Sequence, residues 1–227
     1  MIRMEHMTKT YYIGDEAVHA LDDLSLHVRP NEFVAICGPS GSGKTTLMNM
    51  MGCLDLPDSG TYLLDGVDVL DCNDRELSLI RSRKIGFVFQ QFNLLNQMTA
   101  LENVELPLIY QKCSQKERTE RAKEALSQVG LGKRMLHTPT QLSGGQQQRV
   151  AIARALANNA QVILADEPTG NLDSKSGNDI MTLIENLSGQ GHTVVLITHS
   201  MEVAKRAQRM VFVKDGKLYK TLEEAAV

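Results

Sequence analysis

The sequence lacks any long apolar run. No hydrophobic stretch approaches the roughly 20 residues that a membrane-spanning helix needs. Its first twelve residues carry Arg3, Glu5 and Lys9, and they lack the apolar centre of a signal peptide. We therefore expect no direct membrane span, so any work at a membrane would go through a partner.

An excess of positive charge is also missing. The chain has 24 Lys and Arg against 27 Asp and Glu, which gives a formal net charge of −3. Proteins that hold nucleic acid gather basic side chains against the phosphate backbone. Nucleic acid is therefore not expected as the main partner.

Cysteine is scarce, with four residues at positions 37, 53, 72 and 113 that show no metal-ligand spacing. This usage favours reduced structural thiols over a disulfide framework or a zinc site. What is present is ordinary: 42% hydrophobic and 22% charged residues in 227 positions. Such a chain can bury a full core as one domain with a small insertion.

A glycine-rich segment at 38–45 matches a phosphate-binding loop, with Lys44 and Thr45 at its end. An apolar strand at 33–37 precedes it and a helix-like stretch at 46–51 follows, flanks that a flexible linker would not have. The loop would turn backbone N–H groups toward a polyphosphate. Lys44 would reach the β- and γ-phosphates, and Thr45 would bind Mg²⁺.

Alternating residues before position 30 predict two half-buried strands joined by a turn at Gly14-Asp15. Tyr11 and Tyr12 lie between them. An aromatic ring beside a nucleotide pocket could stack on a base, but a tyrosine next to a strand is also typical of a core or an interface.

Three later apolar strands end at polar side chains. In open α/β sheets, ligands bind outside the carboxyl ends of the strands. One of these strands ends at two adjacent carboxylates, Asp166 and Glu167, which are costly at a strand end without a cation. Because neighbouring strand residues point to opposite faces, one side chain would face a metal and the other a water. The alternatives are a surface loop at Gln90, a simple turn at Asp166 and Glu167, and a structural role for His199. The strands are 85–89 before Gln90, 162–165 before Asp166 and Glu167, and 193–198 before His199.

The chain from 99 to about 136 is typical of helices, and 117–129 has apolar residues at helical spacing opposite a charged face. Next, Leu142-Ser143-Gly144-Gly145-Gln146 opens another helix. A capping serine with two glycines could cradle a second anion, although it could also be an ordinary helix start.

Together these motifs resemble the nucleotide-binding subunit of ATP-binding cassette (ABC) transporters over essentially all 227 residues. Stretches at 52–55, 85–95, 100–108 and 164–173 look like the branch that serves lipoprotein release and macrolide export. The resemblance implies a single α/β domain: a phosphate-loop NTPase core with a mixed sheet and an antiparallel β subdomain (1–91 and 160–227), and an inserted helical subdomain (about 92–159).

The resemblance also implies roles for individual residues. Two chains would close head to tail around two ATP molecules, with Mg²⁺, so that one chain's signature segment meets the γ-phosphate held by the other. The nucleotide-binding residues would be Tyr11, Gly38, Pro39, Ser40, Gly41, Ser42, Gly43, Lys44, Thr45 and Thr46. The signature residues would be Ser143, Gly144, Gly145 and Gln146, with Asp173 in the following D-loop. The Mg²⁺ ion would be held by Thr45, Gln90 and Asp166. Glu167 would polarise the attacking water, and Gln90 would also touch that water. His199 would contact the γ-phosphate.

The sequence thus predicts an ATPase that powers a membrane export complex, held on the inner face of the cell membrane by a permease. The alternative is a family member that transmits motion to the cell envelope without moving a solute. Soluble family members that act on DNA or ribosomes carry insertions or second cassettes that this sequence lacks. Gly170-Asn171 departs from the usual pattern before Asp173, and we expect it to affect interface timing more than chemistry.

Overall fold

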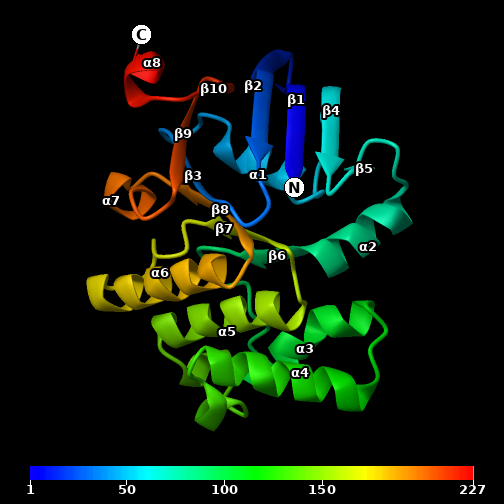
Figure 1. The fold of residues 1–227 in the computed structure, drawn as a ribbon, viewed down its shortest axis with the longest axis vertical. Coiled ribbons are helices and arrows are strands. Elements are labelled where there is room, and N and C mark those ends of the chain that lie inside the picture. The colour runs from blue at the N-terminus through cyan, green and yellow to red at the C-terminus, as the bar shows by residue number, and fades with distance from the viewer. Residues whose placement is uncertain (227) are drawn as a thin grey trace. The chain divides into compact units, whose positions relative to one another are not determined.

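The computed structural model describes residues 1–226. They form two compact units: unit 1 contains Met1–Leu77 and the chain from Thr193 onward, and unit 2 contains Ser78–His192. Figure 1 shows the elements by label. The predicted division of one domain into a core (1–91 and 160–227) and a helical subdomain (about 92–159) stays a prediction.

Unit 1 contains a four-stranded antiparallel sheet in the order β2-β1-β4-β5. The predicted turn at Gly14-Asp15 joins its first two strands. Alternate residues of these strands, such as Ile2 and Met4, are buried, because successive side chains of a strand point to opposite faces. The strands are β1 (Ile2–Ile13), β2 (Glu16–Val28), β4 (Ser59–Leu64) and β5 (Val67–Asp68).

A second group of strands in unit 1 is parallel. β3 (Phe33–Cys37) lies between β8 (Thr193–Thr198) and β9 (Arg209–Lys214), and β10 (Lys217–Tyr219) returns antiparallel to β9. All residues of β3 are buried, as a strand covered on both faces requires. The helices of this unit are α1 (Lys44–Met51), α7 (Met201–Ala204) and α8 (Leu222–Ala226). α1 begins two residues before the predicted start.

Unit 2 combines two parallel strands, β6 (Ile85–Val88) and β7 (Val162–Asp166), with most of the helices. Amphipathic α4 buries Ala122, Ala125 and Leu126, as its spacing predicts. The helices are α2 (Asp74–Lys84, which starts at the end of the preceding unit), α3 (Ala100–Tyr110), α4 (Gln115–Gln128), α5 (Gly144–Ala157) and α6 (Ser174–Gly189), with 3-10 turns η1 (Gly132–Arg134) and η2 (Pro139–Gln141).

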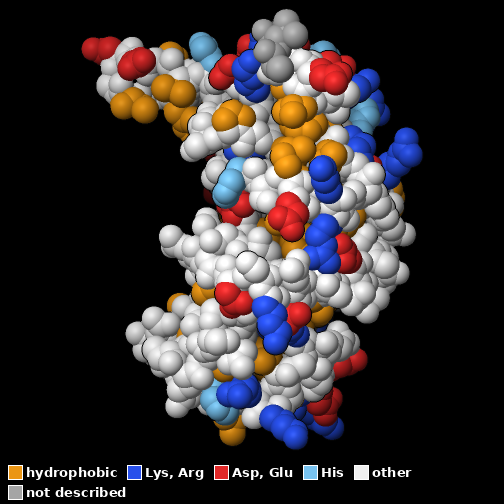
Figure 2. Space-filling view, turned by 90° about the vertical axis from the view of Figure 1, so that its left-hand side faces the viewer, with side chains coloured by type: hydrophobic (Ala, Val, Ile, Leu, Met, Phe, Trp, Pro, Cys, Tyr) orange, Lys and Arg blue, Asp and Glu red, His pale blue; other side chains and the backbone are white. Residues whose placement is uncertain are grey.

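The surface carries charges of both signs. On the face drawn in Figure 2, Lys and Arg side chains are interspersed with Asp and Glu, as expected for a chain with a net charge of −3. None of the helices within residues 1–226 combines the length and the apolar character required to cross a membrane.

Candidate nucleotide-binding and hydrolysis site

The glycine-rich segment connects β3 to α1 in unit 1, as predicted. Gly43 caps α1 at a φ of 103°, and its cap contains no side-chain hydrogen bond within the described chain. A Cβ at Gly43 would lie 2.3 Å from the carbonyl oxygen of Ala20. Glycine at 43 therefore lets the loop approach β2 and leaves the start of α1 available to an anion.

Lys44 folds back over this loop. Its Nζ donates to the carbonyl oxygens of Gly38 (2.9 Å) and Pro39 (2.5 Å), and to Ser42 Oγ at 3.3 Å. Carbonyl oxygens and phosphate oxygens are both acceptors for an ammonium. The ammonium therefore stays at the loop, where phosphate oxygens could replace these partners.

A cavity of about 580 Å³ lies in unit 1 beside the loop. Gly41, Gly43, Lys44, Thr45 and Thr46 line one part of it, and Tyr11, Val18, His19, Ala20, Asp215 and Gly216 line the rest. Its volume is within the range of small-molecule and cofactor sites. The glycine loop, the ammonium and the aromatic wall fit a nucleoside triphosphate.

The ring of Tyr11 is anchored at the edge of this cavity. Its hydroxyl donates to Asp55 Oδ2 at 2.6 Å, and Lys9 Nζ lies 5.3 Å from the ring centroid while it bonds Asp55 Oδ1 at 2.9 Å. Burial and then the hydrogen bond to Asp55 raise the pKa of Tyr11. Burial would also raise the pKa of Asp55, but its bonds to Tyr11 and Lys9 lower that pKa overall. The ring therefore stays neutral and fixed in orientation, as base stacking requires.

His199 directly follows β8, as predicted. Cys37 of β3 pairs with Thr198 of β8 in the parallel register. Gly38 and His199 consequently leave the sheet at the same edge of unit 1, so the histidine and the phosphate loop start side by side.

The two carboxylates come at the end of β7 in unit 2. The strand ends at Asp166, and Glu167 has a φ of 44°, where a non-glycine residue is strained by about 1–3 kcal/mol. The expectation that both residues continue the strand and alternate across it is therefore wrong for Glu167, because the chain turns there. The N–H of Gly170 donates to the carbonyl of Glu167 at 3.0 Å and closes that turn. Strain of this kind clusters at active sites.

Gln90 follows β6 in the same unit and contacts the segment after β7. Its Nε2 donates to Asn171 Oδ1 at 3.3 Å, and Asn171 Nδ2 donates to the carbonyl of Gln90 at 3.0 Å. No local sequence pattern indicates this pair. The structure therefore brings Gln90 together with the residues that lead into Asp173.

The signature serine and the D-loop aspartate both cap helices. Ser143 Oγ accepts from the N–H of Gln146 at 3.4 Å, and Gln146 Oε1 accepts from the N–H of Ser143 at 3.0 Å. Asp173 Oδ1 accepts from the N–H of Ser176 at 2.9 Å, and this bond lowers the pKa of Asp173. The ordinary helix-start interpretation is thus correct for Ser143, and Asp173 likewise caps the helix that follows it. Neither cap precludes the further role that the resemblance implies.

Within residues 1–226, no group of three or more His, Cys, Asp or Glu side chains could hold a metal ion. Mg²⁺ in nucleotide sites typically uses one or two protein ligands with phosphate oxygens and water. The Thr45 hydroxyl beside the phosphate loop fits such a shared donor set.

The strand, glycine loop and helix with their lysine define a phosphate-loop nucleotide-binding protein. Residues 21–170 match the family described as ABC transporter. The chain therefore belongs to the ABC transporter family, and within it to the ATP-binding subunits, which hydrolyse ATP. The predicted family, fold and ATPase activity are confirmed, whereas the roles of individual residues stay predictions.

Relatives cover nearly the whole chain. An uncharacterized ABC transporter ATP-binding protein, YvrO of Bacillus subtilis, is 55% identical over 218 residues, which is 96% of this chain and 95% of that protein. The macrolide export ATP-binding/permease protein MacB of Brucella melitensis is also 55% identical over 218 residues, but this chain spans only 34% of its length.

Solved structures of a third relative match the fold. A dimeric structure of MJ0796, an ABC transporter cassette, has a TM-score of 0.88 at 51% identity and covers 97% of this chain and 98% of that one. A second structure of MJ0796, in a post-hydrolysis state bound to ADP and Pi, has a TM-score of 0.88 at 50% identity and covers the same 97% and 98%. The Methanocaldococcus jannaschii protein is named as an uncharacterized ABC transporter ATP-binding protein.

Proposed function

We propose that this chain hydrolyses ATP to drive a membrane export complex, and that it works as a head-to-tail homodimer on a permease at the cytoplasmic face of the membrane. The relation to MacB, named as a macrolide exporter that joins an ATP-binding part to a permease, supports the export role. The dimeric form of MJ0796 supports the homodimer.

ATP supplies the phosphoanhydride bond, and Mg²⁺ offsets charge on its phosphates. In this proposal the loop N–H groups and Lys44 hold the phosphates, and Thr45 with Asp166 serves the metal. Glu167 accepts a proton from the attacking water, while Gln90 orients that water.

The site is completed by three further residues. His199 donates to the γ-phosphate from the edge it shares with Gly38. Ser143 and Gly145 of the second copy contact the same phosphate. Positioned donors of this kind stabilise the charge that develops during phosphoryl transfer.

The observation that carries the hydrolytic role is the strained turn at Glu167. We expect Glu167→Gln to lower kcat by about 10²- to 10⁴-fold, the range for general-base assistance. ATP binding should survive, and a dimer should accumulate with Mg-ATP. Glu120→Gln, an exposed glutamate of α4, is the matched control and should keep wild-type turnover. A Glu167→Gln protein that hydrolyses ATP at the wild-type rate would refute the assignment.

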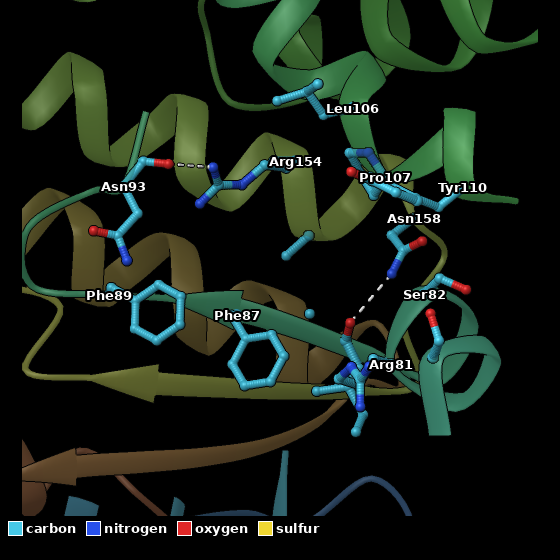
Figure 3. A pocket seen from close by; sticks show the side chains of 14 residues that line it. Arg81, Ser82, Phe87, Phe89, Asn93, Leu106, Pro107, Tyr110, Arg154 and Asn158 are labelled. Carbon is cyan, nitrogen blue, oxygen red and sulfur yellow. Dashed lines mark hydrogen bonds between the residues drawn. The ribbon is translucent and has the colours of Figure 1, made fainter. Parts of the chain in front are cut away.

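The permease contact is proposed at a cavity of about 420 Å³ in unit 2 (Figure 3). Phe87 and Phe89 stack on one wall with ring centroids 5.4 Å apart, and Leu106, Pro107 and Tyr110 line the opposite side. Tyr110 is 71% exposed. An apolar cavity with an exposed aromatic rim suits one face of an amphipathic helix.

Leu106→Arg should reduce the amount of integral membrane protein that copurifies with the tagged chain from detergent-solubilised membranes. Leu136→Arg is the control, because Leu136 is 75% exposed and does not line the cavity. Equal copurification by the wild type and both variants would contradict the proposed docking site.

A further inference from the structure

Gln90 and Asn171 are 81 residues apart in the chain, yet they form a two-point contact. β6 and β7 pair in parallel with Val88 opposite Ala165, so the segments that follow them leave the sheet at the same edge. The Gln90 side chain is half-buried, whereas Asn171 is exposed. Both hydrogen bonds are exposed, and a hydrogen bond typically adds only about 1 kcal/mol to folding.

The backbone decides which atoms of the two amides meet. The carbonyl of Gln90 can only accept, so the Asn171 atom beside it must be the donor Nδ2. The other Asn171 atom is then Oδ1, which can only accept, so the Gln90 atom that faces it must be Nε2. The carbonyl thereby fixes both amide orientations, which hydrogen-bond networks generally determine.

The remaining atom of the Gln90 amide is Oε1. Mg²⁺ binds oxygen ligands, and a water that attacks phosphorus is oriented by an acceptor for one of its hydrogens. An amide flipped the other way would present N–H groups, which can do neither. The contact with Asn171 therefore selects the flip of Gln90 that suits the reaction.

Gly170 makes room for this arrangement. A Cβ at position 170 would lie 2.7 Å from Gln90 Nε2 and 3.1 Å from its Cδ. Gly170 does not have a positive φ, so its backbone would accept alanine without strain. The space beside Gln90, rather than backbone freedom, explains why glycine suits this position.

We propose that Asn171 is a positioning residue that fixes the orientation of the Gln90 amide, with Gly170 as the clearance it needs. The inference rests on the proposed function, because Gln90 must first act at the metal or the water. It replaces the expectation that Gly170-Asn171 affects mainly the timing of the interface.

The test combines single and double variants of the purified full chain. Asn171→Leu and Gly170→Ala should each lower kcat by about 10-fold, while the KM for ATP and Tm change little, since misplacing a reacting group by about 1 Å can cost up to 10²-fold. Asn171→Asp keeps the shape but loses the Nδ2 donor, so it should resemble Asn171→Leu. In a Gln90→Ala background, Gly170→Ala and Asn171→Leu should cause no further loss.

Matched controls come from α6 of the same unit. A Cβ at Gly189 would meet no heavy atom of the described chain within 4 Å, and Asn186 has an exposed side chain. Gly189→Ala and Asn186→Leu should keep wild-type kcat.

The outcomes separate the two claims. Wild-type kcat in Gln90→Ala would overturn the role of Gln90 and this inference with it. If Gln90→Ala is impaired but Asn171→Leu turns over at the wild-type rate, only the inference is overturned. An Asn171→Leu loss of equal size in the wild-type and Gln90→Ala backgrounds would overturn it too, because the residue would then act independently of Gln90.

Discussion

Replacing Gly43 by alanine should weaken ATP binding far more than the same change at Gly41. Both residues have a positive φ, 103° and 77° respectively, so each alanine incurs about 1–3 kcal/mol of backbone strain. The surroundings differ. A Cβ at Gly41 would meet no heavy atom of residues 1–226 within 4 Å, whereas one at Gly43 would lie 2.3 Å from the carbonyl oxygen of Ala20.

Ordinary contact for such a Cβ begins near 3.4 Å, so the loop and β2 must separate by about 1 Å at Gly43. Forcing extra atoms into a packed site typically costs about 1–3 kcal/mol. In the free protein the loop can relax away from β2, and ATP binding must then restore its geometry, so up to this whole cost falls on binding. Because about 1.4 kcal/mol corresponds to a tenfold change in Kd, we expect Gly43→Ala to bind ATP more weakly than Gly41→Ala, by up to about 150-fold.

Isothermal titration calorimetry with Mg-ATP measures both affinities, and thermal unfolding measures both stabilities. Gly43→Ala should have the lower Tm and the weaker binding. Equal Kd and equal Tm for the two variants would show that the close approach to Ala20 does not shape the phosphate loop, and the reasoning would fail.

Lys44→Ala should abolish most ATP affinity in calorimetry, and unchanged binding would discard its phosphate role. Tyr11→Phe keeps the ring but loses the hydrogen bond to Asp55, so it should bind ATP about 5-fold more weakly than the wild type. Tyr11→Ala also loses the ring and should bind ATP more weakly still. Equal ATP affinity of the wild type, Tyr11→Phe and Tyr11→Ala would exclude stacking. Burial raises the pKa of Glu32, but hydrogen bonds from Arg209 lower it overall, so the pair stabilises the fold near neutral pH and less as the pH falls through that lowered pKa. Thermal unfolding should therefore show a higher Tm for the wild type than for Glu32→Gln at pH 7, with a difference that shrinks as the solution is acidified. A difference that stays constant with pH would contradict the pairing.

Much of the fold and of the candidate site could be predicted because local patterns specify them. The strand before Gly38, the helix opened by Ser143 and the turn at Gly14-Asp15 each depend on residues within about a dozen positions. Contacts between distant segments have no such pattern. Tyr11 meets Asp55 across 44 positions, and nothing in either local sequence indicates the pair.

Backbone strain is equally hidden from local reasoning. Glu167 has no intrinsic preference for a positive φ, and the surrounding turn imposes it. The apolar run at 162–165 therefore predicted the strand that ends at Asp166, but treating Glu167 as its next strand residue was wrong.

The cap at Ser143 limits which residues can stand at that position. A hydroxyl has one hydrogen and two lone pairs, and the bond from the Gln146 N–H uses a single lone pair. The hydroxyl hydrogen is still available to donate to a phosphate, so in the proposed site the Ser143 hydroxyl would both cap the helix and bind the nucleotide. Alanine would remove both contributions and aspartate would keep only the first, whereas threonine keeps both, so a genetic screen should recover threonine in preference to alanine or aspartate.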